Sequence, residues 1–119
     1  MATHEEIQAA AGTLREAISV KLGGLADQVL GRPEFGSSEW TTEWKQRDSP
    51  LGRARLKEWH LVKMQIARAA GTDQTGDVIN ARGCGASWAE IGQACGITRQ
   101  AAHDRWAKLA PAKVTDRAD

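Results

Sequence analysis

The segment from Gly85 to Trp106 constrains the fold most, because it carries start and stop signals for two short helices with almost no chain between them. Ser87 and Glu90 stand three residues apart, which is the spacing of a capping box, and Gly96 supplies the left-handed position that ends a helix. Thr98 can cap a second helix that starts at once. Two helices this close together cross over a tight turn, which leaves room only for small residues between them.

The second of these helices is amphipathic. Ala102, Trp106 and Leu109 follow one another at four- and three-residue steps and form an apolar face, which we expect to be buried together with Trp88 of the first helix. At 100° per residue, the opposite face is mostly polar and lacks the Glu/Lys pairs of an ordinary solvated helix. That face carries Arg99, Gln100, His103, Asp104, Ala107 and Lys108.

The same segment resembles the helix-turn-helix of the LuxR-type regulators and of sigma factor region four. The resemblance rests on Ala-Glu-Ile at residues 89–91, on Gly-Ile-Thr at residues 96–98, and on Arg105 before the apolar Trp106. It spans roughly residues 78–109. The resemblance implies sequence-directed binding to DNA and no catalysis.

One position departs from the pattern of those families. Ala102 stands where they usually carry Val or Ile, so the indoles of Trp88 and Trp106 are expected to fill that part of the core. Short helices separated by glycine also occur in folds that do not bind DNA, and this alternative stands beside the resemblance.

Side chains on the polar face suit the edges of DNA bases. Arg pairs with guanine and Gln with adenine in the major groove, so Arg99 and Gln100, with His103 one turn later, are the candidate base-reading residues. Backbone phosphates are bound by hydroxyls and cations. The candidates for phosphate contact are Ser87, Thr98, Lys108, Arg53, Arg55 and Lys57.

The formal net charge of +1 hides a polarised chain. Residues 1–44 contain three Lys or Arg against seven Asp or Glu, residues 45–71 contain seven against two, and residues 72–119 contain six against six. The middle segment could therefore supply the attraction to phosphate that dominates nucleic-acid affinity. The alternative is an ordinary solvated helix face. The cations of the middle segment are Lys45, Arg47, Arg53, Arg55, Lys57, Lys63 and Arg68.

Residues 3–30 have the period of an amphipathic helix. If this helix is continuous through Gly23 and Gly24, its apolar stripe is a candidate dimerisation seam; if it breaks there, an intramolecular hairpin is expected instead. We favour dimerisation. The stripe consists of Ile7, Ala11, Leu14, Ile18, Leu22, Leu25 and Val29.

Residues 31–50 are expected to be irregular, apart from one helical turn that places Trp40 and Trp44 on the same face. A Trp pair at this spacing is expected to anchor the core. The alternative is an exposed surface that binds a partner or stacks on bases.

Two more helices are expected before Gly85. Ser49 and Pro50 open the first, which ends at Gly71. The second begins at Thr72 or Asp73 and stops at residues 83–85, with Val78 and Ile79 pointing inward. The apolar side of the first consists of Leu56, Trp59, Val62 or Lys63, Ile66 and Ala70.

The sequence gives little support to catalysis, and it predicts no enzyme, no metal site and no cofactor. Cys84 and Cys95 lack the spacing of metal ligands; Cys95 falls on an inward face, whereas Cys84 lies between two glycines and is expected to be an accessible thiol. The chain lacks a run of 18 apolar residues and does not begin with a signal peptide, so we expect a cytoplasmic protein without membrane contact.

These observations predict an all-helical protein. Residues 1–71 form an N-terminal helical region for dimerisation and backbone contact, residues 72–110 form a three-helix DNA-binding domain with the helix-turn-helix, and residues 111–119 form a loose tail. The predicted function is a sequence-specific transcriptional regulator that binds double-stranded DNA as a homodimer, most simply as a repressor. The alternatives are a sigma-like factor that contacts RNA polymerase and a protein-binding adaptor that does not touch DNA.

Overall fold

The computed structural model describes residues 1–109, and every regular element in that range is a helix, which confirms the all-helical class. The expected tail at residues 111–119 lies outside the described residues. None of the described helices combines the length and apolarity needed to cross a bilayer. The helices are α1 (His4–Leu30), α2 (Ser38–Lys45), α3 (Pro50–Ala70), α4 (Thr75–Gly83), α5 (Trp88–Cys95) and α6 (Arg99–Trp106).

Helix α1 is continuous through both glycines, so the alternative of a broken helix that folds into a hairpin is wrong. Thr3 and Glu6 form a capping box at its start, and Gly31 ends it with a φ of 65°. Packing explains why Gly23 is tolerated: a Cβ there would lie 3.0 Å from the Trp59 ring. The Trp59 Nε1–H also donates to the Gly23 carbonyl at 3.3 Å, which ties α1 to α3.

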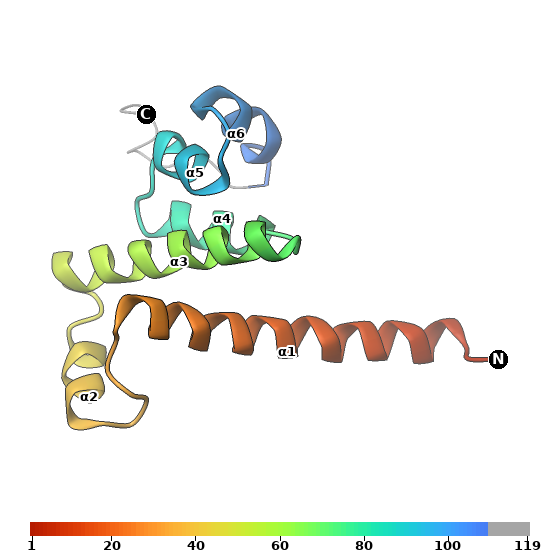
Figure 1. Cartoon of the computed structure of the whole chain (residues 1–119), viewed down its shortest axis with the longest axis horizontal. Coiled ribbons are helices and arrows are strands. Elements are labelled where there is room, and N and C mark those ends of the chain that lie inside the picture. Colours follow the sequence, from red (N-terminus) through yellow and green to blue (C-terminus); the bar gives the residue numbers. More distant parts are fainter. Residues whose placement is uncertain (110–119) are drawn as a thin grey trace.

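Helix α3 is the central element. It packs along α1 on one side and against α4 and α5 on the other, so it connects the long N-terminal helix to the short C-terminal helices (Figure 1). Met64 of α3, Val78 of α4 and Ile91 of α5 are fully buried where these helices meet. Together with the indoles of Trp88 and Trp106 they form a single apolar core.

A buried ion pair joins α3 to α4 beside this core. Lys63 Nζ lies 2.8 Å from Asp77 Oδ1 and 3.9 Å from the centroid of the Trp59 ring. His60 Nδ1 approaches the same carboxylate oxygen at 3.8 Å. Lys63 is therefore a buried partner of Asp77, and our inclusion of it among the cations available to phosphate is wrong.

Three apolar residues that we expected to be buried are exposed. Val78 and Ile79 are neighbours about 100° apart on α4, and only Val78 faces α3. Leu109 follows the end of α6 and is therefore not part of its buried face. Ala70 occupies the last turn of α3 and is exposed as well.

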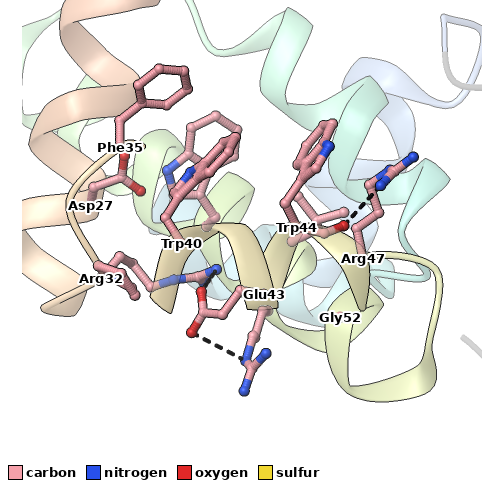
Figure 2. Close-up of a pocket in the computed structure, with 12 residues that line it drawn as sticks. Asp27, Arg32, Phe35, Trp40, Glu43, Trp44, Arg47 and Gly52 are labelled. Carbon is pink, nitrogen blue, oxygen red and sulfur yellow. Dashed lines mark hydrogen bonds and ion pairs between the residues drawn. The ribbon is translucent and has the colours of Figure 1, made fainter. Parts of the chain in front are cut away.

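The Trp pair of α2 is only partly a core anchor. Trp40 is half-buried, but half of the Trp44 surface is exposed, so the expectation is wrong for Trp44. The two indoles stack with ring centroids 5.6 Å apart. The Phe35 ring centroid lies 4.5 Å from that of Trp40, and the Arg47 guanidinium carbon lies 4.4 Å from the centroid of the Trp44 ring. The result is a column of four planar groups along a cavity of about 270 Å³ between α2 and helices α1 and α3 (Figure 2).

Candidate nucleic-acid interface

Helices α5 and α6 are separated only by residues 96–98, and local hydrogen bonds set both ends of this turn. Ser87 and Glu90 form the expected capping box at the start of α5, and Gly96 ends that helix with a φ of 69°. Thr98 Oγ1 accepts from the Ala101 N–H at 3.1 Å and caps α6. The sequence signals for two short helices with a tight turn are therefore all used.

Gly92 is the position at which the turn passes closest to α5. A Cβ there would lie 2.8 Å from the Ile97 carbonyl oxygen and 2.9 Å from that of Thr98. Both atoms belong to the backbone, so neither can move aside without shifting the turn itself. The direction of α6 relative to α5 therefore depends on a glycine at residue 92.

We expect Gly92→Ala to destabilise the chain by about 1–3 kcal/mol, because the added methyl group overpacks a backbone contact. Gly76→Ala in α4 is the matched control: no atom lies within 4 Å of its Cβ position, and alanine favours a helix by about 1 kcal/mol. Urea unfolding followed by circular dichroism measures both. Equal effects of the two substitutions would contradict the close approach.

The polar face of α6 is open to a partner. Arg99, Gln100, His103 and Asp104 are all exposed on this face, whereas Ala102 and Trp106 on the other face are buried. Within the face, Gln100 Nε2 donates to Asp104 Oδ1 at 2.8 Å, one helical turn away. The structure thus brings the three candidate base-reading residues onto one exposed surface.

Packing limits the freedom of His103. Its ring meets the Trp88 indole edge-on, with centroids 5.5 Å apart, and its Nδ1 lies 3.7 Å from Asp104 Oδ1. Because Trp88 is buried in α5, this contact links the exposed face of α6 to the preceding helix. His103 is therefore held close to α5, while Arg99 and Gln100 extend from the first turn of α6.

The start of α5 holds Ser87 and one of the candidate cations from α3. Lys57 Nζ lies 3.1 Å from Glu90 Oε2, the same carboxylate that closes the capping box. Burial of Glu90 opposes ionisation, but the Ser87 N–H and the Lys57 ammonium outweigh it and hold the pKa of Glu90 below its ordinary value. Ser87 and Lys57 thus lie together at the N-terminus of α5.

The three candidate cations of α3 do not share one surface. Arg53 and Lys57 lie one turn apart and border a shallow pocket beside Cys84, in the loop before α5. Arg55 lies on the other side of α3, where its Nε is 3.9 Å from Glu43 Oε1 of α2. Arg53 and Lys57 therefore lie near α5, and Arg55 belongs to the cavity under α2.

Arg68, one of the cations of the middle segment, lies near the α5–α6 turn. Its guanidinium covers Gly96, so that a Cβ on Gly96 would collide with it. Met64, one turn earlier on α3, contacts Cys95 with 3.9 Å between the two sulfur atoms. Met64 and Arg68 are four residues apart, and this spacing places both side chains on the side of α3 that faces α5.

The two cysteines are free thiols, and Cys84 is half-buried rather than accessible. Burial raises the pKa of Cys84 despite the nearby charge of Arg53, and burial likewise raises the pKa of Cys95. A raised pKa reduces the thiolate fraction at neutral pH, and the thiolate is the reactive form. Neither thiol therefore has the electrostatic activation of a redox centre.

The chain was compared with protein-family models, curated protein sequences and solved structures, and no match was found in any of the three.

Proposed function

We propose that this protein binds double-stranded DNA in a sequence-specific manner and regulates transcription, most simply as a repressor that occludes a promoter. The observation that carries the proposal is the exposed polar face of α6, presented by a helix whose other face is locked into the core by Ala102 and Trp106. The major groove of B-DNA admits one α-helix, and sequence is read there through base edges.

The first turn of α6 supplies the chemistry for reading bases. Arg99 can donate two hydrogen bonds to guanine, and Gln100 can both donate to and accept from adenine. The carboxylate of Asp104, held beside Gln100, can accept from the amino group of cytosine. Since these three side chains lie within six consecutive residues of one helix, they would contact neighbouring base pairs.

The surroundings of α6 supply contacts to phosphate. Arg53 and Lys57 lie near the start of α5, and Arg68 covers the α5–α6 turn at Gly96. Thr98 caps α6 as an acceptor and keeps its O–H to donate to a phosphate oxygen. Cations and hydroxyls around a reading helix fix its register on DNA without carrying sequence information. Lys108 lies just beyond the end of α6 and is exposed.

Selection of bound sites from a random duplex library tests the proposal directly. At the selected site we expect Arg99→Ala and Gln100→Ala each to cost about 1–3 kcal/mol and to relax the preference at one position, while non-specific affinity changes less. Arg15→Ala, which removes an exposed cation from α1, is the control and should leave the preference intact.

Two outcomes would contradict this assignment. Unchanged sequence preference in both variants would mean that another element reads the DNA. No detectable binding to duplex DNA at low salt would instead favour the protein-binding adaptor, because attraction to phosphate is strongest under that condition.

The proposal includes a homodimer, because two copies of one reading helix would recognise two half-sites about one helical turn apart. Because the dimer links two copies of α6, its affinity for a palindromic site is also well above its affinity for a single half-site. The exposed apolar stripe on α1 is the surface available for this pairing.

A further inference from the structure

The N-terminal half of α1 extends past the end of α3 (Figure 1). Along this half, Ile7, Leu14 and Ile18 are 55%, 61% and 38% exposed. They lie on the same side of α1 as Leu22 and Leu25, which are half-buried where α1 packs against α3. The apolar stripe of α1 is thus partly covered by α3 at Leu22 and Leu25 and uncovered at Ile7, Leu14 and Ile18; Val29, at its C-terminal end, is also 67% exposed.

An apolar cavity of about 290 Å³ lies where the cover ends. Ile18, Leu22 and Leu25 line it from α1, and Ile66 and Ala67 line it from α3. Lys21 borders the same cavity. The cavity is therefore continuous with the exposed stripe, and an apolar side chain that entered it would approach along α1 from its N-terminal half.

We propose that the occupant is α1 of a second copy of this chain, packed antiparallel around a twofold axis between Gly12 and Thr13. In this register Ile7 lies opposite the partner's Ile18, and Ala11 lies opposite the partner's Leu14. Each Ile7 side chain then enters the cavity beside Ile18 of the other copy. This pairing specifies the homodimer of the proposed function. The two α1 helices would pair whether or not DNA is bound.

Side-chain volume favours the antiparallel arrangement. The steps of four, three and four residues from Ile7 to Ile18 are those of a coiled-coil seam. A parallel pair would place Ala11 against its own copy and Leu14 against its own copy, leaving a gap in one layer and crowding the next. The antiparallel pair combines one small and one large residue in each of these layers, which fills the seam evenly.

Charge favours the same arrangement. Glu6 lies in the first turn of α1, about 100° around the helix from Ile7 and therefore beside the stripe. In a parallel pair this carboxylate would lie near its own copy, and like charges repel. In the antiparallel pair it lies near the level of the partner's Lys21, and the two helix dipoles run in opposite directions. The side-chain charges and the helix dipoles therefore both oppose the parallel dimer and support the antiparallel one.

Cysteine cross-linking of the full chain in the absence of DNA tests the register. Ala11→Cys and Leu14→Cys are introduced separately into a Cys84→Ser background and are oxidised alone or as an equal mixture. A disulfide needs Cα atoms within about 7 Å, so we expect a linked dimer from the mixture and none from either variant alone. A dimer from Ala11→Cys alone would overturn the proposal in favour of a parallel pair.

Light scattering at micromolar concentration provides a second measurement. Leu14→Lys should convert the dimer to a monomer, whereas Val20→Lys should not, because Val20 is 74% exposed on the opposite side of α1. Both sites are exposed, so neither substitution disturbs the core. An unmodified chain that is monomeric and gives no cross-link in the mixture would overturn the pairing. Cross-linking without any DNA binding would leave the pairing intact and remove the proposed function.

Discussion

Trp106→Ala is expected to destabilise the chain by about 3–5 kcal/mol, which is the range for removing a buried indole from a packed core. The Trp106 side chain is only 3% exposed and packs in one cluster with Met64, Ile91 and Ala102. Because the total stability of a small domain is about 5–15 kcal/mol, a loss of this size removes a large part of it. Urea unfolding monitored by circular dichroism gives the difference in free energy.

Leu109→Ala is the matched control for this experiment. Leu109 lies three residues further along the chain and is exposed, so its truncation should change stability by less than about 0.5 kcal/mol. A Trp106→Ala protein that unfolds at the same urea concentration as the parent would contradict the packing of α6 on the core. Loss of stability at both positions would mean that Leu109 is covered, for example by a partner.

The C-terminal helices were the most predictable part of the fold, because their limits are set by short-range interactions. Ser87, Glu90, Gly96 and Thr98 act within three or four residues of their own backbone, and each performs the local role expected from sequence. Gly92 was also predictable, since a turn this short forces the backbone toward α5. Local hydrogen bonds and steric contacts can be inferred without knowing what the rest of the chain does.

Residues whose surroundings come from distant segments were predicted less well. Val78 and Ile79 are equally apolar, and only the position of α3 determines which of them is buried. Trp44 has the spacing of a core residue, but Arg47 covers its ring at the surface. The contacts that the α3 cations make depend in the same way on where α2, α4 and α5 pack. The helical period places Arg53 and Arg55 about 200° apart on α3, but only the packing of the other helices determines that Arg53 lies beside the α4–α5 loop and Arg55 beside Glu43.

Lys63 shows the physical reason most clearly. A lysine on the apolar side of a helix reads as an interruption of that face, and its partner Asp77 lies in another helix. Burial of either charge alone would be costly, so the pair is stable only because α3 and α4 bring the two groups within 2.8 Å. The stability of the pair is therefore a tertiary property that a sequence pattern does not contain.

Lys63→Met is expected to destabilise the chain by about 3–5 kcal/mol, because it leaves the Asp77 carboxylate buried without its main partner. Methionine is unbranched and only one heavy atom shorter than lysine, so little packing is lost. The double variant Lys63→Met with Asp77→Leu should recover most of the stability, since it removes both charges. If the double variant is less stable than Lys63→Met, the cost comes from altered packing and not from an unpaired charge.

Acid unfolding gives an independent test of the same pair. Burial of Asp77 opposes ionisation, but the neighbouring His60 ring and the Lys63 ammonium outweigh it, so the pKa of Asp77 in the folded chain lies below the ordinary value of 3.8. Such a group contributes stability that is fully present above pH 3.8 and is lost as the pH falls through the lower, folded pKa. In Lys63→Met the pKa of Asp77 should rise, so the loss of stability should begin at a higher pH than in the parent. Nuclear magnetic resonance titration of the Asp77 carboxyl carbon measures both values, and an unchanged midpoint in Lys63→Met would show that Lys63 does not hold this carboxylate in its ionised form.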